Sequence, residues 1–403
     1  MSPSDVPRRP LSTATRCARP LRAALGALHV TLFTAALTAC APPFPDITNW
    51  DTPLAAGPEA DERLLWQKAE EDVDAAEKEG ELYESEPLVA YLEAIVALLA
   101  PPLPSTGPKL RVRVVRDVDL SAAALADGTI LIALPLVVRF ANEDQLASVL
   151  AHELVHVLRR HGLRSQRYET LTGSHVERMK LSRALEQEAD REAIALVAAA
   201  GYAPGECVPA LSITAQRMPG THARTIRTWE SHDDLWVRVA AMKTALRALP
   251  ARSTAQPLRI EPFRRAMDPH RLAAAKLELD AEQFESARAL IQEHLERHPD
   301  SGPAYALRAL VAAREKPEQR LSDPVGADLE RAVEYGPQDP EALRALGLYL
   351  RDTGAPERSN EMLRRYLASR PDAVDRKLIE GYLARPALPA PPHESLGAPD
   401  PSR

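Results

Sequence analysis

The chain has 403 residues and a net charge of −7, with 45 % hydrophobic and 27 % charged residues. This composition is typical of globular proteins, and the lack of a basic excess argues against a nucleic-acid partner. Only three cysteines are present, too few for a disulfide-based scaffold or a four-cysteine structural zinc site. A chain of this length is expected to form two domains.

The first 39 residues have the layout of a secretory signal peptide. Residues 1–22 contain five arginines and one acidic residue, and an apolar run from Ala23 to Ala36 follows. This run is too short to span a bilayer. It ends in Leu37-Thr38-Ala39-Cys40, which resembles the bacterial lipobox, whose cysteine becomes lipid-modified. The alternative is a plain secretory signal with a coincidental cysteine.

A lipid on Cys40 would anchor the mature protein to a membrane that it does not cross. Residue 41 is alanine and not aspartate, which by the lipobox resemblance implies sorting to the outer membrane of a Gram-negative bacterium. The location implied is therefore periplasmic. Residues 40–60 contain five prolines and are expected to form a flexible tether.

Two helices and two strands are expected after the tether. The patterns predict helices over residues 61–79 and 86–100. Residues 110–115 alternate as a strand, and Gly128 opens a second strand that continues through Ala133. If this second strand is an exposed edge beside the site described next, an extended peptide could add to it by main-chain pairing.

Residues 152–156 read His-Glu-Leu-Val-His, an HExxH motif on a strongly predicted helix. Asn142 and Gln145 form a capping box at the start of this helix, apolar residues follow at helical spacing, and Gly162 is expected to close it. The pentapeptide alone can arise by chance. The amphipathic helix around it favours a functional site.

Each fixed position of the motif has a chemical role. His152 and His156 lie one above the other on the same helical face, so both imidazoles can bind a single Zn²⁺. Glu153 lies beside the first ligand, where its carboxylate can take a proton from water at the metal. These residues predict a zinc peptidase.

The segment Glu186-Gln187-Glu188-Ala189-Asp190 offers the third ligand that a catalytic zinc site requires. Glu186 and Asp190 are four residues apart, so one helical face carries a metal-binding carboxylate and a second carboxylate. Asp190 is suited to accept the second ring N–H of a ligand histidine and to fix its tautomer. Glu188 is the competing ligand, and we favour Glu186.

Several segments in order resemble the HtpX/Oma-type gluzincin zinc metallopeptidases. They are Asp127–Ile132 with Glu143–Glu153, Glu186–Asp190, and Ser231-His232 with Arg238. The resemblance implies a mostly helical α+β, zincin-like metallopeptidase domain over residues 61–250, with a small antiparallel sheet. It also implies one Zn²⁺ per chain, held by His152, His156 and Glu186.

The roles of His232 and Arg238 come from the resemblance alone. It implies that either can donate to the oxyanion of the reaction. It also implies that His232 can act as a latency switch, as a fourth zinc ligand in a resting enzyme. The alternative is a surface histidine beside Asp233 and Asp234. His161 is interpreted as a structural residue, or as a cation suited to the C-terminal end of the helix.

From about residue 269 the pattern changes to paired helices. Residues 339–349 are close to a tetratricopeptide first helix, and prolines at 299, 340 and 371 recur every 36 residues on average, against about 34 for such repeats. We expect two or three degenerate tetratricopeptide-like repeats in an all-α domain. The expected boundaries are a linker at 251–268, the repeats at 269–385 and a disordered tail at 386–403.

These features favour a lipid-anchored periplasmic zinc metalloendopeptidase. Resemblance to repeat-bearing quality-control proteases implies protein or peptide substrates, namely unfolded or misassembled envelope proteins. The repeats are interpreted as a surface for a substrate or an envelope-assembly partner, with a purely structural helical cap as the alternative. The competing function is an outer-membrane assembly chaperone or scaffold, in which the repeats bind partners and the zinc site is latent.

Overall fold

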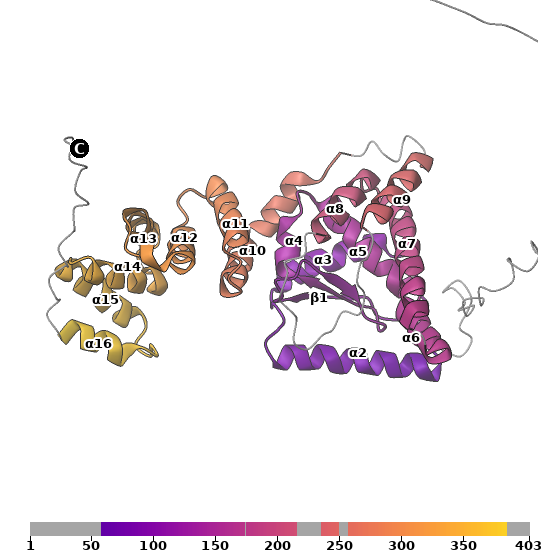
Figure 1. Cartoon of the computed structure of the whole chain (residues 1–403), viewed down its shortest axis with the longest axis horizontal. Helices are drawn as coiled ribbons and strands as arrows, with labels where there is room; N and C mark the ends of the chain where they lie inside the picture. Colours follow the sequence, from indigo (N-terminus) through magenta and orange to yellow (C-terminus); the bar gives the residue numbers. More distant parts are fainter. Residues whose placement is uncertain (1–57, 174, 216–234, 250–256, 385–403) are drawn as a thin grey trace, which may run out of the picture. The chain divides into compact units, whose positions relative to one another are not determined.

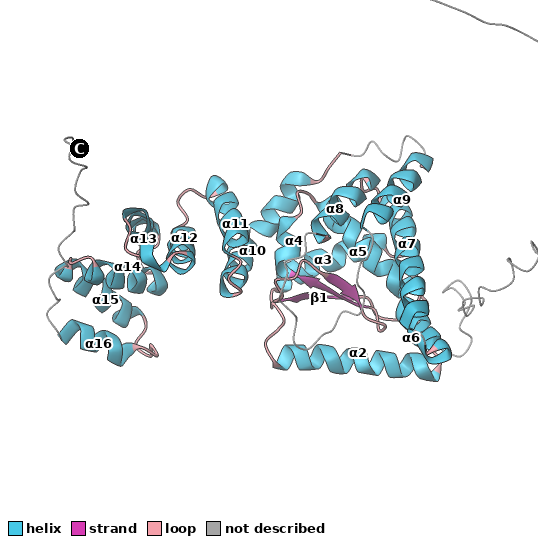
Figure 2. Ribbon diagram, viewed as in Figure 1, coloured by secondary structure: helices cyan, strands magenta, loops and turns pink. Residues whose placement is uncertain are grey.

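The computed structural model of the chain describes residues 58–173, 175–215, 235–249 and 257–384 (Figure 1). The signal and lipidation site at Cys40, most of the tether, His232 and the tail lie outside these ranges. The described part is mostly helical and contains one small sheet (Figure 2). Within it, no helix combines the length and the apolar character needed to cross a bilayer.

The sheet consists of β1 (Arg111–Val115), β2 (Ala122–Ala124) and β3 (Thr129–Ala133), in the order β1-β3-β2. β3 runs parallel to β1, with Thr129 opposite Arg111, and antiparallel to β2, with Ile132 opposite Ala122. The expectation of an antiparallel sheet was therefore wrong, because the sheet is mixed. β3 is the central strand and its residues are buried, so the exposed edge that main-chain pairing with a peptide would need is not present at this strand.

A tight turn explains this strand order. β2 and β3 form a hairpin, which makes them antiparallel, and β3 then inserts beside β1 in the same direction. Gly128 in the turn has φ +96°, and a Cβ there would lie 2.8 Å from the carbonyl oxygen of Lys109. Only glycine allows the backbone before β1 to approach the turn this closely.

Helices cover both faces of the sheet. α2 (Ala60–Lys78) and α3 (Glu86–Leu99) match the two helices predicted before it. Leu131 packs with Ala76 of α2 on one face. Ile130 and Ile132 point to the other face and join the main core, to which α3 and α5 (Glu143–Leu158) contribute. The sheet thus forms one wall of the core through which α5 runs.

Further helices complete this half of the chain and position the site. They are α4 (Leu134–Arg139), α6 (His161–Thr172), α7 (His175–Ala199), the 3-10 helix η1 (Pro204–Glu206), α8 (Cys207–Thr214) and α9 (Leu235–Ala248). α5 packs against α7, α8 and α3. α7 in turn packs against α9, so the helices that carry the candidate residues lie against one another.

The C-terminal half consists of helices that pack in consecutive pairs, α10 with α11, α12 with α13 and α14 with α15. The elements are α10 (Ile260–Asp280), α11 (Phe284–Arg297), α12 (Gly302–Glu315), η3 (Pro317–Gln319), α13 (Asp323–Tyr335), α14 (Pro340–Asp352), α15 (Pro356–Ser369) and α16 (Arg376–Ala384). α10 begins at Ile260, inside the range expected to be a linker. It packs on α4, where Arg271 donates a hydrogen bond of 3.1 Å to the carbonyl of Val138.

Candidate metal centre

The helix of the HExxH motif begins with the predicted capping box. Asn142 is the N-cap, and its side chain accepts a hydrogen bond of 2.9 Å from the backbone of Gln145. The Gln145 side chain reaches back and accepts from the backbone of Ala141 at 2.9 Å. Nearly all of α5 is buried, from Asp144 through Val157. The helix therefore runs through the core, and the surrounding packed residues hold both motif histidines in place.

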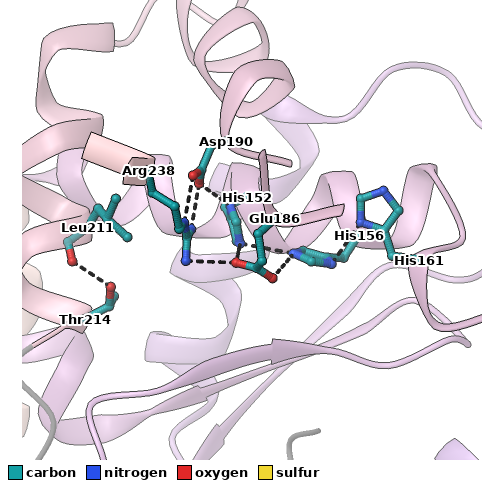
Figure 3. A network of polar contacts seen from close by, with 8 residues as sticks. All are labelled: His152, His156, His161, Glu186, Asp190, Leu211, Thr214 and Arg238. Carbon is teal, nitrogen blue, oxygen red and sulfur yellow. Dashed lines mark hydrogen bonds and ion pairs between the residues drawn. The ribbon is translucent and has the colours of Figure 1, made fainter. Parts of the chain in front are cut away.

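His152, His156 and Glu186 meet at one point, as the sequence predicted (Figure 3). The Nε2 atoms of the two histidines lie 3.0 Å apart. The Glu186 carboxylate comes from α7 and lies 3.5 Å from His152 Nε2 and 3.4 Å from His156 Nε2. All three residues are buried, and their ligand atoms lie within 4.8 Å of one another.

This geometry fits a zinc ion. Ligand atoms bound tetrahedrally at roughly 2.0–2.1 Å from an ion would be separated by about 3.3 Å, close to the three separations seen between His152, His156 and Glu186. Two imidazoles and one carboxylate are a donor set of catalytic zinc sites, which keep a fourth position for water or substrate.

Asp190 and Arg238 surround this cluster with hydrogen bonds. Asp190 Oδ1 lies 3.0 Å from His152 Nδ1, the arrangement expected of a carboxylate that fixes the tautomer of a ligand. Arg238 of α9 donates to both oxygens of Asp190, at 2.8 and 2.7 Å, and its Nη1 lies 2.8 Å from Glu186 Oε2. Arg238 therefore contacts carboxylates through three nitrogens. Its role as an oxyanion donor stays a prediction.

The electrostatics of the centre favour a bound cation. Burial would lower the pKa of His152, but hydrogen bonds with Asp190 and Glu186 outweigh burial and raise the pKa to about 10. Burial would raise the pKa of Asp190, yet its partners Arg238 and His152 hold the pKa below its usual value. Glu153 is also buried, at 4 % exposure, and its charge acts on Arg238.

The family model of Peptidase family M48 matches residues 88–176. The match supports the M48 metallopeptidase family. It spans α3 to the start of α7 and so contains His152, Glu153 and His156, while Glu186 and Arg238 lie beyond it. The family match supports a metallopeptidase function. No curated protein matches the chain.

His161 contacts the candidate metal centre, but it does not lie at the end of the motif helix. His161 was interpreted as structural or as a cation at the end of the motif helix, and Gly162 was expected to close that helix. Instead α5 ends at Leu158, Arg160 takes a left-handed conformation with φ 51°, and His161 begins α6. His161 is fully buried, and its Nδ1 lies 3.0 Å from Nδ1 of His156.

The surroundings of His161 explain why it is not a cation. Burial lowers the pKa of His161, more than its neighbour Glu188 can raise it. Glu188 was the competing zinc ligand, but it accepts a hydrogen bond of 2.9 Å from Arg164 and lies 3.7 Å from His161 Nε2. The nearby ring of His161, aided by Arg164 and opposed by burial, lowers the pKa of Glu188 to about 2.

Local sequence carries no signal for this contact. Residues five apart on one helix point to different faces, so His161 could meet His156 only through a turn between them. The turn is made by Arg160, a residue type that rarely adopts left-handed backbone angles.

Proposed function

We propose that this M48 metallopeptidase is a zinc metalloendopeptidase of the HtpX/Oma-type gluzincin kind. The observation that carries the proposal is the convergence of His152, His156 and Glu186 on one buried point, with Glu153 next to the first ligand. These are three protein ligands and a candidate base, the parts that peptide hydrolysis requires.

A zinc ion held by His152, His156 and Glu186 would polarise the scissile carbonyl and activate water. Glu153 takes the proton from the attacking water and later delivers it to the leaving amine. Asp190 holds the ring of His152 in place through Nδ1. Arg238 links Glu186 to Asp190 and so fixes the third ligand relative to the first.

The setting of this activity is also a proposal. The leader and Cys40 support a lipid-anchored protein in the periplasm, at the outer membrane of a Gram-negative bacterium. Unfolded or misassembled envelope proteins are the proposed substrates, and the paired helices α10–α15 are the proposed tetratricopeptide-like surface for substrates or assembly partners. The contact of α10 with α4 supports a repeat region that is held against the peptidase region.

The deciding experiment follows cleavage of casein, an unfolded protein, by zinc-loaded protein. Glu153→Gln should lower the rate by about 10²–10⁴-fold, the contribution of a positioned general base, and should leave the zinc content unchanged. Glu70→Gln is the matched control, because Glu70 is an exposed glutamate on α2. Wild-type rates in Glu153→Gln would refute the assignment of the base.

A third variant tests latency. His232→Ala should raise the cleavage rate if His232 occupies the open metal position in a resting enzyme. If zinc-loaded wild type and His232→Ala both fail to cleave casein, the competing function gains support, an assembly chaperone or scaffold whose zinc site is latent. That function would not depend on Glu153.

A further inference from the structure

The chain turns sharply at the end of the motif helix, at a cost in backbone energy. Arg160 has φ 51° and ψ 41°, a left-handed conformation that is strained for a non-glycine residue. A buried ion pair holds the turn, with Arg160 Nε 3.0 Å from Glu62 Oε1 of α2. Strain of this kind persists where the surrounding structure demands it, and here it brings His161 back beneath His156.

The two imidazoles meet through their Nδ1 atoms. His161 Nδ1 lies 3.0 Å from His156 Nδ1, and the ring planes stand at 89° (Figure 3). His156 Nε2 points the other way, toward His152 and Glu186. His156 therefore has one nitrogen for a metal and one for His161.

This arrangement determines which ring nitrogen of each histidine carries a proton. When His156 Nε2 is a metal ligand, its ring proton resides on Nδ1 and must be donated. His161 Nδ1 accepts that proton, so His161 carries its own proton on Nε2. That nitrogen is buried, and within the described part of the chain it has no hydrogen-bond partner; Glu188 Oε2 lies 3.7 Å away. Arg164 holds Glu188 with a hydrogen bond of 2.9 Å.

We propose that His161 is a positioning residue that fixes the tautomer and ring orientation of His156 for metal binding. Glu188 and Arg164 hold His161 in turn. The inference rests on the proposed metal site at His152, His156 and Glu186. It gives each histidine ligand its own support, since Asp190 contacts Nδ1 of His152 directly and Glu188 acts on His156 through His161.

The test compares zinc affinity in the wild-type protein, His161→Leu and His161→Asn, measured by competition with a chromophoric chelator. His161→Leu removes the acceptor and should weaken zinc binding by about 10–100-fold, the usual effect of losing such a support. His161→Asn can place an amide oxygen near the former Nδ1 position and should stay within about threefold of wild type.

Two further readouts separate positioning from a purely structural role. The visible spectrum of the Co²⁺-loaded protein should change in His161→Leu and be restored in His161→Asn. Thermal unfolding in excess chelator reports on the fold alone. Equal zinc affinity and identical Co²⁺ spectra in wild type and His161→Leu would overturn the proposal.

Glu188→Gln tests the outer end of this chain of contacts. It should weaken zinc binding by at least about threefold. Glu192→Gln is its matched control, because Glu192 lies one turn further along α7 and accepts a hydrogen bond of 2.7 Å from Arg159. If His161→Leu does not fold, the zinc affinities of Glu188→Gln and Glu192→Gln test the proposal instead. Equal zinc affinities in these two variants would overturn it.

Failure of the metal site itself would look different. In that case the wild-type protein would bind zinc no more tightly than His156→Ala, which would refute the proposed function and not only the role of His161.

Discussion

Arg238 lies 2.8 Å from Glu186, the carboxylate that completes the candidate metal site. The same guanidinium donates two hydrogen bonds to Asp190, which contacts the ring of His152. One buried cation from α9 thus organises both a ligand and the support of another ligand on α7. The position of the third ligand therefore depends on the packing of α9 as well as on α7 itself.

Removal of the Arg238 guanidinium should lower the free energy of unfolding. In Arg238→Gln the carboxylates of Glu186 and Asp190 lose a buried ionic partner, a change that costs about 3–5 kcal/mol in comparable buried pairs. The measurement is urea unfolding in excess chelator. Arg247→Gln, at an exposed position on the same helix, is the control and should change the free energy of unfolding by less than about 0.5 kcal/mol. A similarly small change in Arg238→Gln would contradict the assigned contacts.

Zinc binding should release a proton from the site. The pKa of His152 is raised to about 10 by Asp190 and Glu186 against the opposing effect of burial, so in the metal-free protein this ring is protonated at pH 7. A metal ligand must be deprotonated. The apparent zinc affinity should therefore rise by about tenfold per pH unit between pH 6 and 8.

Calorimetric titration of zinc in two buffers of different ionisation enthalpy measures that proton release. About one proton per zinc is expected at pH 7. His152→Ala removes the titrating group and should flatten the pH dependence of the remaining weak binding. A pH-independent zinc affinity in the wild type would rule out a protonated His152 in the metal-free site.

The parts of the site that follow helical periodicity could be predicted from the sequence. The capping box at Asn142 fixed the start of α5, and the four-residue spacing placed His152 and His156 on one face. The same spacing put Glu186 and Asp190 on one face of α7, where the first contacts both ligand histidines and the second contacts His152.

The parts that depend on distant segments could not be predicted. Glu62, far upstream, pairs with Arg160 and allows α5 to end before Gly162. The order of the strands depends on the approach of Lys109 to Gly128, which alternation within a strand does not reveal. The contact between His161 and His156 could not be predicted, because it depends on the left-handed turn at Arg160.

Arg259 links the start of α10 to the start of the motif helix. Its backbone carbonyl accepts from Glu143 at 3.1 Å, and its backbone N–H donates to Asp144 at 2.9 Å. The guanidinium lies 4.1 Å from the centre of the Tyr202 ring and donates to the carbonyl of Gly201 at 3.2 Å. The guanidinium also lies 3.6 Å from Asp144 and 3.8 Å from Glu143, so the backbone and the side chain of one residue both join the C-terminal half to α5.

Arg259→Ala should lower the free energy of unfolding by about 1–2 kcal/mol, because it removes a cation–π contact, a hydrogen bond and two long ion pairs but keeps the backbone bonds. Arg264→Ala is the control, since Arg264 is exposed on α10. If the contact also transmits the position of α10 to the site, the casein cleavage rate should fall in Arg259→Ala and not in Arg264→Ala. Equal rates in the two variants would limit Arg259 to a stabilising role.

His270 should make the fold sensitive to mild acid. Burial lowers the pKa of His270 below its usual 6.5, and its Nδ1 lies 3.0 Å from the hydroxyl of Tyr83. Below pH 6.5 the unfolded chain binds this proton more readily than the folded one. Stability should therefore fall as the pH drops below 6.5, until the pH reaches the lowered pKa of the folded state.

The test compares the free energies of unfolding at pH 7.5 and pH 5.0. His270→Phe removes the titrating ring and should lose less stability between these two pH values than the wild type. Tyr83→Phe removes only the hydroxyl that hydrogen-bonds to His270, so it should cost about 1 kcal/mol at pH 7.5 and keep the acid sensitivity. An identical loss on acidification in wild type and His270→Phe would assign the sensitivity to other groups.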